Sequence, residues 1–567
     1  MEGDKYMVEK KYQHWLNHKN ITPILKEELS KMNEEQKNDA FYTNVEFGTA
    51  GMRGILGAGT NRLNIFTLRK ANLGFAKYIL ANGEEAKKRG VAISYDNRHM
   101  SKEFAIDCAN LMAMHGIKSY VFKKLRPTPE LSYAVRYFNC FGGIMITASH
   151  NPKEHNGYKI YDETGCQLVP ELVEQVINYA KEVEDELDIE VINTTNLVQM
   201  VQEEVDDSYN KAVLDIQLNP QLTKTVKIVF TPQHGTAIDP IRIIFNEAGY
   251  DVRYVEKQCT IDPNFSNTLS PNPEVADAYV GAIELAKEVD ADIVLTTDPD
   301  ADRLGVAVKH NNDYVLMTGN QSAAVLLEYV LSQLEEKGTM PKNPVMFNTI
   351  VTADIGEKIA SSYGVETEKT LTGFKFIGNK IASYEKTKEK SFVFGYEESY
   401  GCLLADFVRD KDALQACIML AEASNYYLQN DKTLIDVLHE LYDKHGWYLD
   451  TQKSKNFAGE QGLQDMNDML DKLQDNVPTS IGDFNVIRYE NYFNLTATSN
   501  GREEKLDFLS AAVLKYYLSD GTWIAIRPSG TEPKCKFYYC IKGNDNVEVN
   551  SKLDKYLQDI AELIAKK

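Results

Sequence analysis

Short apolar runs that each end in a polar loop recur along the chain, and longer stretches with helical spacing separate them. Such runs occupy residues 91–95, 227–230, 293–297, 345–347 and 391–394. The segment 273–289 has the spacing of an amphipathic helix and precedes the run at 293. Strands that alternate with helices of this kind predict right-handed βαβ units and mixed, mostly parallel sheets.

The chain beyond residue 436 has a different pattern. Residues 484–489 and 493–497 have the composition of β-strands joined by a short turn, 523–526 form another apolar run, and 536–542 alternate between apolar and polar residues. Long helices do not separate these strands as they do earlier in the chain. This pattern predicts a smaller α+β domain at the C-terminus.

Length and composition limit the architecture. A chain of 567 residues is too long for one core, so three or four domains are expected. No apolar run reaches the ~18 residues of a membrane helix, and the charged N-terminus lacks a signal-peptide core. The eight cysteines are scattered without a Cys-x-x-Cys pair, which predicts neither a disulfide framework nor a zinc site. These features together predict a cytoplasmic protein.

The net charge narrows the range of partners. The chain has 62 basic and 83 acidic residues, a formal charge of −21. This balance argues against nucleic acid and anionic membranes as partners. A local basic cleft on an acidic protein can still bind a small anionic substrate.

The loop at residues 147–152, Thr-Ala-Ser-His-Asn-Pro, follows the apolar run 141–146. Polar loops at the ends of buried strands are where α/β proteins place reactive groups. We expect Ser149 at the exposed tip of this loop with His150 beside it, and a turn at 156–159 that brings Lys159 back. A serine hydroxyl is a poor nucleophile unless a base or a metal activates it.

A second loop, Asp298-Pro-Asp-Ala-Asp-Arg303, follows the run at 293. Three carboxylates at alternate positions in an extended turn can converge on one ion. Mg²⁺ prefers oxygen ligands and usually takes one more from a phosphate. An Asp-rich turn alone explains one or two such residues, but not three at this spacing followed by Arg303. The two loops together predict phosphoryl transfer.

Three further loops carry suitable groups. The loop 527–534 combines Arg527, two hydroxyls, a glycine amide and Lys534, the inventory of a phosphate cradle. The glycine-rich loop 47–54 ends in an arginine and lets backbone amides approach an anion, although it is not a P-loop. The Glu-Glu-Ser sequence at 397–399 offers acceptors and a hydroxyl that suit the hydroxyls of a sugar.

Five loops therefore stand in a fixed order: FGTAGMRG (47–54), TASHNPKEHNGYK (147–159), DPDADR (298–303), GYEESYG (395–401) and RPSGTEPK (527–534). Over essentially the whole chain this set resembles the α-D-phosphohexomutase superfamily, and within it the long bacterial phosphoglucomutases and the related phosphopentomutases. The stretch 370–375, TLTGFK, resembles the superfamily's sugar-orienting loop. The stretch 409–412, RDKD, resembles the segment that supplies an active-site lysine.

The resemblance implies an α/β fold of three similar mixed α/β-sheet domains plus a smaller C-terminal α+β domain around a central cleft. It implies a phosphoserine-bearing domain at 1–205, a metal-binding domain at 206–318, a sugar-binding domain at 319–436 and a phosphate-binding domain at 437–567.

The resemblance also implies roles for individual residues. Ser149 would carry a phosphoryl group, and one Mg²⁺ would be held by a phosphoserine oxygen with Asp298, Asp300 and Asp302. A phosphoserine adds about −1.5 to −2 charge, which three carboxylates would repel without a divalent ion. Arg53 and Arg303 would offset charge on the transferring group, and the candidates for general acid and base are His150, Lys159 and Lys411. The sugar would be bound by Thr372, Gly373, Lys375, Glu397 and Ser399. The phosphate that does not react would be bound by Arg527, Ser529, Gly530, Thr531 and Lys534.

The implied reaction is the interconversion of glucose 1-phosphate and glucose 6-phosphate, an isomerisation by phosphoryl transfer. Glucose 1,6-bisphosphate would be both intermediate and activator, and the protein would be a monomer or weak dimer.

Alternatives remain open at the level of sequence. Tyr396, where many phosphoglucomutases have glycine, keeps a phosphopentomutase acting on ribose or deoxyribose phosphates possible, and Ala50 and Met52 are smaller departures from the pattern. A phosphatase using the same serine would release inorganic phosphate without needing a bisphosphate. A non-catalytic regulator should have lost a chemical residue, and none of the five loops shows such a loss.

Overall fold

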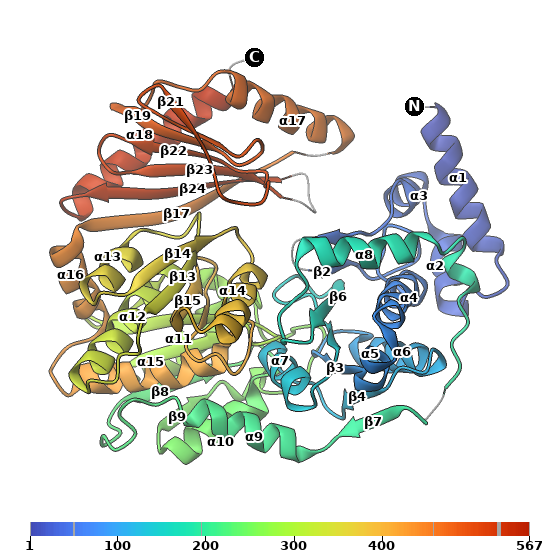
Figure 1. Ribbon diagram of the computed structural model, residues 1–567, viewed down its shortest axis with the longest axis horizontal. Helices are drawn as coiled ribbons and strands as arrows, with labels where there is room; N and C mark the ends of the chain where they lie inside the picture. Colours follow the sequence, from blue (N-terminus) through green and yellow to red (C-terminus); the bar gives the residue numbers. More distant parts are fainter. Residues whose placement is uncertain (1, 49–50, 194–195, 458, 530–533, 566–567) are drawn as a thin grey trace. The chain divides into compact units, whose positions relative to one another are not determined.

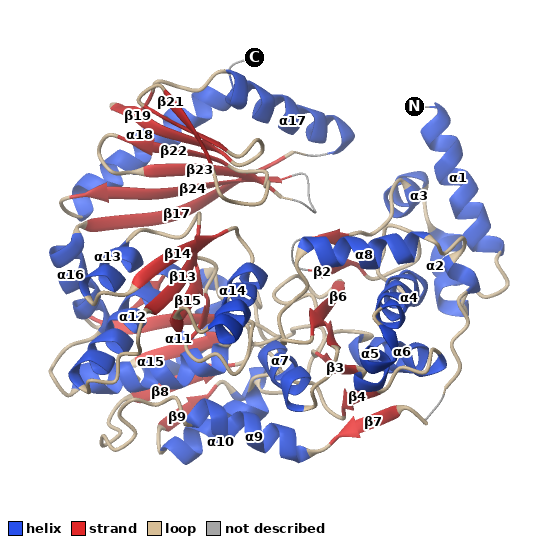
Figure 2. Ribbon diagram, viewed as in Figure 1, coloured by secondary structure: helices blue, strands red, loops and turns tan. Residues whose placement is uncertain are grey.

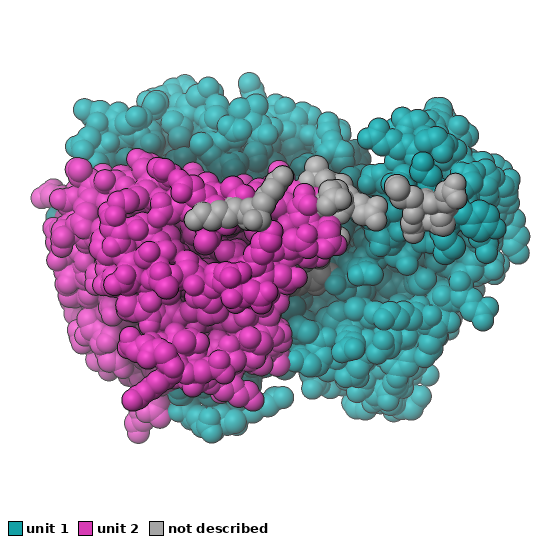
Figure 3. All heavy atoms as spheres, turned by 90° about the horizontal axis from the view of Figure 1, so that it is seen from above, with its two compact units in different colours: residues 1–316, 373–395, 400–430 teal, residues 317–372, 396–399, 431–567 magenta. Residues whose placement is uncertain are grey.

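The computed structural model describes all residues except 1, 49–50, 194–195, 458, 530–533 and 566–567 (Figure 1). The chain divides into two compact units, shown in teal and magenta in Figure 3. Unit 1 contains residues 1–316, 373–395 and 400–430, and unit 2 contains residues 317–372, 396–399 and 431–567. The chain therefore passes between the units several times.

The first sheet of unit 1 has seven strands, in the order β1 (Phe47–Gly48), β2 (Gly51–Ile55), β6 (His155–Asp162), β5 (Gly142–Ile146), β3 (Val91–Tyr95), β4 (Ser119–Phe122) and β7 (Val198–Val201). The strands β5, β3, β4 and β7 are parallel to one another. The other three pairings are antiparallel, namely β5 with β6, β6 with β2, and β2 with β1. The strands are apolar because helices pack on the sheet.

The helices of this region are visible in blue in Figure 2. They are α1 (Glu2–Asn17), α2 (Pro23–Lys31), α3 (Glu34–Phe41), α4 (Ile65–Ala81), α5 (Gly83–Arg89), α6 (Ser101–Met114), α7 (Thr128–Tyr137), α8 (Pro170–Lys181), the short 3-10 helix η1 (Glu186–Asp188) and α9 (Glu203–Leu214). The core over the sheet includes Leu68, Phe75, Ile93 and Ile144. The N-terminal helices share a separate small core around Trp15.

The second sheet has five strands, in the order β12 (Asp313–Met317), β11 (Leu304–His310), β10 (Ile293–Thr297), β8 (Lys227–Thr231) and β9 (Asp251–Tyr254). The strands β10, β8 and β9 are parallel, and β11 is antiparallel to β10. The associated helices of unit 1 are α10 (Ile238–Ala248), η2 (Glu256–Gln258), η3 (Ala276–Tyr279), α11 (Val280–Val289) and α15 (Ala413–Leu428).

The third sheet has four strands, in the order β14 (Glu366–Thr370), β13 (Pro344–Thr349), β15 (Ser391–Glu397) and β16 (Gly401–Leu403), with β13 and β14 parallel. The helices of this region of the chain are α12 (Gly319–Glu336), α13 (Ile355–Ser362), α14 (Phe374–Thr387) and α16 (Leu434–His445). The capping box of Thr318 and Gln321 fixes the start of α12.

The C-terminal sheet is antiparallel, in the order β17 (Trp447–Asn456), β24 (Lys534–Gly543), β23 (Trp523–Pro528), β22 (Leu514–Leu518), β19 (Phe484–Asn491), β20 (Thr496–Ser499) and β21 (Arg502–Lys505), with β18 (Ser480–Ile481) paired to β19. The helices α17 (Gly459–Asp475) and α18 (Asn546–Ala565) complete this domain. Three domains with mixed α/β sheets and a smaller antiparallel C-terminal domain confirm the predicted fold class.

No helix in the part of the chain that the structure describes is both long enough and apolar enough to cross a membrane.

Lys515 on β22 is a buried lysine within unit 2. Its Nζ donates a hydrogen bond to the Ile350 carbonyl at 2.6 Å and lies 4.0 Å from the ring centroid of Trp523. Burial lowers the pKa of Lys515 to about 7, and the charge of Lys369 acts in the same direction. Between this value and the ordinary pKa of lysine, the unfolded chain binds a proton that the folded chain lacks. Folding stability should therefore rise with pH across this window.

We expect Lys515→Met to remove this pH dependence. Above about pH 7, the free energy of opening of β22 should rise with pH in the unaltered protein, relative to the variant, by up to about 1.4 kcal/mol per pH unit. Below about pH 7 the two proteins should run parallel, since Lys515 is then protonated whether folded or unfolded. Hydrogen exchange of the β22 amides, corrected for intrinsic rates, measures this quantity. The exposed Lys453→Met on β17 is the control, and equal slopes in all three proteins would contradict the prediction.

Candidate active site

Ser149 lies in the loop that joins β5 to β6. Its φ of +53° is rare for a residue other than glycine and is the kind of backbone geometry that concentrates at functional sites. Its N–H donates to Thr147 Oγ1 at 2.8 Å, and its hydroxyl donates to Asp298 Oδ2 at 2.6 Å. The hydroxyl oxygen is also 3.1 Å from His150 Nδ1. The serine thus has both a carboxylate and an imidazole within hydrogen-bond distance.

The predicted exposure of Ser149 is wrong. The residue is only 1% exposed, and its hydroxyl is hydrogen-bonded to Asp298 of the aspartate loop instead of facing solvent. A buried hydroxyl reacts in a low-dielectric environment in which charge interactions are stronger than in water.

Arg98 organises the backbone of this loop. Its guanidinium donates to four carbonyls, those of Ser149 at 2.6 Å, Pro152 at 2.7 Å and His155 at 3.0 Å, as well as that of Asn151. Asp96 pairs with the same guanidinium at 3.3 Å. Both side chains are completely buried. An arginine fork that binds several carbonyls holds a loop in one conformation.

Asp96 is itself held by several donors. It accepts hydrogen bonds from the hydroxyls of Thr147 and Ser101, both at 2.7 Å, and from the Arg98 N–H at 3.0 Å. Burial raises the pKa of Asp96, against the effect of Arg98 and these donors. The segment after β3 therefore supports the reactive loop after β5, and the two strands are parallel neighbours in the first sheet.

The aspartate loop follows β10. Ligand oxygens of Asp298, Asp300 and Asp302 lie within 4.8 Å of one another, and all three residues are buried. Asp298 Oδ1 accepts the N–H groups of Asp302 at 3.1 Å and Arg303 at 3.0 Å, which fixes the turn. The site thus has the oxygen donors that a hard divalent cation prefers.

Two oxygens of this cluster are suited to bind an ion. Within the described residues, Asp300 Oδ1 and Asp302 Oδ1 are buried and have no hydrogen-bond partner. Buried polar atoms of this kind normally have a partner, so an ion is a natural one. The donor set and its two orphaned oxygens fit Mg²⁺.

The pKa values of Asp298 and Asp300 are shifted in opposite directions. Burial raises the pKa of Asp298 well above its usual range, and the charges of Asp300 and Asp302 add to this effect. Burial alone would also raise the pKa of Asp300, but Lys159 and further hydrogen bonds hold it below its usual range. Three close carboxylates therefore need compensating cations.

Two lysines supply part of this compensation. Lys159 Nζ lies 2.9 Å from Asp300 Oδ2 and 3.6 Å from Asp302 Oδ2. Lys411 Nζ lies 3.1 Å from Asp302 Oδ2 and 3.2 Å from Asp410 Oδ1. The predicted turn at 156–159 is wrong, since these residues belong to β6 and Lys159 pairs with Met145 of β5. Strand pairing, rather than a turn, brings this lysine to the site.

The other predicted residues of the phosphoryl site are close to the same loops. His150 is partly buried. Desolvation, together with the charges of Arg303 and Arg53, lowers the pKa of its imidazole well below the usual range. Arg53 on β2 donates to Asn151 Oδ1 at 3.2 Å. Arg303 forms an ion pair with Glu274. A neutral imidazole beside Ser149 can exchange a proton, whereas the arginines remain cations.

The loop at 372–375 spans the boundary between the units, with Thr372 in unit 2 and Gly373 and Lys375 in unit 1. Gly373 has a φ of +121°, which strains other residues. Lys375 is buried at the start of α14, burial lowers its pKa, and its carbonyl accepts a hydrogen bond from Cys166 Sγ at 3.2 Å.

In unit 2, the predicted sugar ligand Glu397 is the last residue of β15 and is buried, and Ser399 is partly exposed. Their neighbour Glu398 accepts a hydrogen bond from Thr349 Oγ1 at 3.3 Å. Burial and the charge of Glu397 raise the pKa of Glu398 to about 7, against the effect of the cations Lys536 and Arg527.

Three of the predicted phosphate ligands, Arg527, Ser529 and Lys534, lie at the adjoining ends of β23 and β24. Arg527 pairs with Lys536, and the Ser529 N–H donates to the Lys534 carbonyl at 2.7 Å. Gly530 and Thr531 lie outside the described residues. The strands thus place Arg527, Ser529 and Lys534 at one end of the C-terminal sheet.

Sequence reasoning missed three residues, namely Asp96, Arg98 and Asp410. Asp410 accepts from the Tyr161 hydroxyl at 2.8 Å and contacts Lys411. The polar triplet 96–98 after the apolar run 91–95 was the available signal for the first two. Nothing local indicates that Arg98 reaches a loop 51 residues away.

The fold and this site define an α/β enzyme that holds a serine hydroxyl against three buried carboxylates. Models of phosphoglucomutase/phosphomannomutase alpha/beta/alpha domains I, II and III match residues 44–187, 207–311 and 318–445, and the model of the C-terminal domain matches 484–542. The chain belongs to the phosphoglucomutase/phosphomannomutase family. This confirms the resemblance to the α-D-phosphohexomutase superfamily, and the protein is a mutase of the isomerase class.

Similar proteins agree with this membership. The chain is 36% identical over 529 residues to a phosphoglucomutase of Staphylococcus haemolyticus. The aligned residues cover 92% of this chain and 94% of the relative. A putative phosphomannomutase structure from Thermus thermophilus gives a TM-score of 0.68 at 19% identity, with 92% of this chain and 100% of that chain covered. The open form of a Paramecium phosphoglucomutase gives 0.67 at 19% identity, with 93% and 96% covered. At these identities, the structures show a shared fold.

Proposed function

We propose that the protein is a phosphoglucomutase that interconverts glucose 1-phosphate and glucose 6-phosphate through a phosphoserine at Ser149. The observation that carries the proposal is the 2.6 Å hydrogen bond from Ser149 Oγ to Asp298 in the buried aspartate cluster. The relative from Staphylococcus haemolyticus, matched along nearly its full length, supports the choice of substrate.

In the proposed first step, the bond between phosphorus and Ser149 Oγ breaks as a bond forms to the 6-hydroxyl of glucose 1-phosphate. The hydroxyl proton passes to one of three candidate bases, His150, Lys159 or Lys411. The resulting glucose 1,6-bisphosphate then reverses its orientation in the site. Ser149 Oγ attacks the phosphorus of the 1-phosphate, the bond from that phosphorus to the sugar oxygen breaks, and glucose 6-phosphate is released. Arg53 and Arg303 offset the charge of the transferring group.

Asp298, Asp300 and Asp302 would hold one Mg²⁺ together with an oxygen of phosphorylated Ser149. Bound there, the ion neutralises negative charge and polarises the phosphoryl group for in-line transfer. The two orphaned oxygens of the cluster support this assignment.

Membership of the family supports the assignment of the substrate ligands. Glu397 and Ser399, with the loop of Thr372, Gly373 and Lys375, would bind the sugar hydroxyls, while the phosphate that does not react would be bound by Arg527, Ser529, Gly530, Thr531 and Lys534. In this proposal the four domains are 1–205, 206–318, 319–436 and 437–567.

The position of Tyr396 weakens the pentose alternative. The phenol is completely buried in unit 2, where its hydroxyl occupies the space next to Gly356 on α13 that a Cβ there would need. On a strand, neighbouring side chains point to opposite faces, so Tyr396 and Glu397 face different sides of β15. Tyr396 therefore gives no reason to favour ribose.

A coupled assay with Mg²⁺ and a trace of glucose 1,6-bisphosphate tests the proposal by comparing glucose 1-phosphate with ribose 1-phosphate. Faster turnover of the glucose ester is the expected result. Dominant turnover of the ribose ester would make the protein a phosphopentomutase with the same mechanism. Release of inorganic phosphate without dependence on the bisphosphate would make it a phosphatase.

We expect Asp300→Asn to lower turnover by about 100-fold or more, because one ligand charge is lost and Lys159 is left without its closest partner. Activity should also vanish when divalent ions are removed with a chelator, and return when Mg²⁺ is added. Initial rates over a Mg²⁺ titration measure both effects. Asp290→Asn, an exposed aspartate of the same domain, should behave like the unaltered protein. An unchanged Mg²⁺ dependence in Asp300→Asn would contradict the metal assignment.

A further inference from the structure

The N-terminal helix α1 precedes the family-matched residues 44–187 and meets the segment around η1 in a cluster of imidazoles and carboxylates. His14 Nε2 lies 2.6 Å from Asp185 Oδ2. The His14 and His18 rings are 5.3 Å apart between centroids, since the two residues are one helical turn apart in sequence. This cluster is separate from the aspartate loop and has no part in the proposed mechanism.

The ligand atoms of this cluster are close enough to share one ion. One ring nitrogen from each histidine and one oxygen of Asp185 lie within 4.8 Å of one another. Bonds of ~2.0–2.1 Å to a tetrahedral zinc ion place its ligands about 3.3 Å apart. Binding of an ion would draw the three groups to that spacing, and two bonds to the ion would replace the short His14–Asp185 hydrogen bond.

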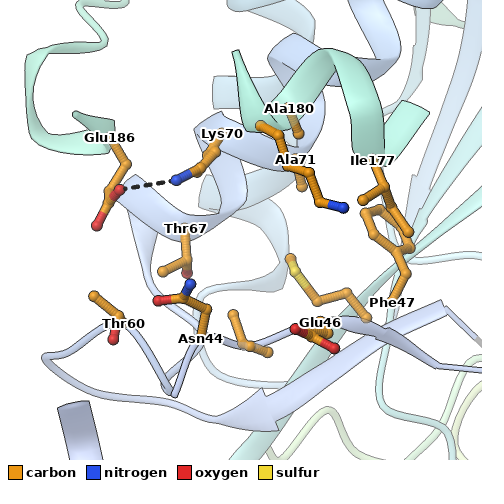
Figure 4. A pocket seen from close by; sticks show the side chains of 13 residues that line it. Asn44, Glu46, Phe47, Thr60, Thr67, Lys70, Ala71, Ile177, Ala180 and Glu186 are labelled. Carbon is orange, nitrogen blue, oxygen red and sulfur yellow. Dashed lines mark hydrogen bonds and ion pairs between the residues drawn. The ribbon is translucent and has the colours of Figure 1, made fainter. Parts of the chain in front are cut away.

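The carboxylate side of the cluster is held in place. Asp185 Oδ1 accepts the Leu187 N–H at 2.9 Å, which directs Oδ2 towards His14. Glu186, the next residue, pairs with Lys70 of α4 at 3.2 Å (Figure 4). Leu187 is buried in the core around Trp15. A fixed ligand loses less conformational freedom when an ion binds.

Asp188 is a second carboxylate close to His18. Its Oδ1 is 3.4 Å from His18 Nε2, while His18 Nδ1 accepts the Asn20 N–H at a long 3.3 Å. An ion on Nδ1 would replace that weak bond and leave an Nε2–H facing Asp188. A carboxylate behind a metal-bound histidine fixes the ring and makes the nitrogen a better ligand.

We propose that His14, His18 and Asp185 form a binding site for a divalent transition-metal ion such as Zn²⁺, with Asp188 as a positioning residue. Imidazole with carboxylate suits zinc, copper and nickel, whereas Mg²⁺ prefers an all-oxygen site. The side chains of His14, His18 and Asp185 are 50%, 12% and 26% exposed, so an ion enters from solvent. The ion ties the N-terminal helix to the first α/β domain.

The test is Zn²⁺ titration calorimetry on the full chain in excess Mg²⁺, which occupies the aspartate cluster. One equivalent should bind the unaltered protein, and the midpoint of thermal unfolding should rise with Zn²⁺ concentration. His14→Ala and His18→Ala should each weaken binding more than 100-fold, and Asp188→Asn by about 10- to 100-fold. His115→Ala, a histidine on the same unit that bonds the Leu111 carbonyl, is the control and should bind normally.

Spectroscopy separates this site from the aspartate cluster. With Cu²⁺ as the probe, electron paramagnetic resonance should show coupling to two imidazole nitrogens, and His14→Ala should lose one of them. Absence of Zn²⁺ binding, or binding lost in Asp300→Asn but kept in His14→Ala, would overturn the proposal. Mutase turnover of His14→Ala in Mg²⁺ should match the unaltered protein, so failure of the proposed function would not imitate failure of this site.

Discussion

Ser149→Ala should reduce turnover of glucose 1-phosphate by about 10⁴- to 10⁶-fold, because no other group can carry the phosphoryl between the two ends of the sugar. The fold should persist, since the alanine removes only one hydroxyl and its bond to Asp298. Initial rates in the coupled assay measure the loss. Intact mass spectrometry after incubation with glucose 1,6-bisphosphate should show one added phosphoryl group in the unaltered protein and none in the variant.

Ser101→Ala is the matched control for this prediction. Ser101 is also a buried serine whose hydroxyl donates to an aspartate, Asp96, at 2.7 Å. It should lose about 0.5–1.5 kcal/mol of stability with its hydrogen bond, yet still accept the phosphoryl group. Full turnover by Ser149→Ala, or phosphorylation at another residue in that variant, would refute the role of Ser149.

Arg98→Met should destabilise the first α/β domain by about 3–5 kcal/mol and lower turnover as well. The change leaves Asp96 buried without its cation, and breaking a buried ion pair from one side is costly. It also removes the donors to four carbonyls of the loop that carries Ser149. Calorimetric unfolding and hydrogen exchange of residues 147–155 measure the two effects.

Arg89→Met provides a comparison for Arg98→Met. Arg89 also donates to two carbonyls, those of Asn139 and Cys140, and pairs with Glu163. Its ion pair is partly exposed, so the loss should be within about 1 kcal/mol and turnover should not change. The double variant Asp96→Asn/Arg98→Met should be less destabilised than Arg98→Met, because the buried charge is removed too. Equal effects of Arg98→Met and Arg89→Met would show that the buried pair does not organise the loop.

Local patterns in the sequence were sufficient to predict several strands and the polar groups that follow them. Apolar runs with polar ends predicted β3, β5, β8, β10, β13 and β15, because burial and period are local properties of the chain. The same local chemistry indicated three aspartates that converge and a serine loop, and the structure brings these loops into contact. Parallel strands end at the same edge of a sheet, which places the loops after β3 and β5 together. The strands β5 and β10 belong to different sheets, so this rule does not explain why the serine and aspartate loops meet.

The groups that support the site from distant parts of the chain are set by tertiary contacts. Ser149 is buried instead of exposed, and Lys159 reaches Asp300 from a strand instead of a turn. Tyr396, which kept a pentose substrate open at the level of sequence, packs into the core of unit 2. Arg98, in the segment after β3, donates hydrogen bonds to the serine loop after β5, the parallel neighbour of β3. Strand pairing and side-chain burial set these contacts, and both depend on residues far apart in the chain that no local pattern connects.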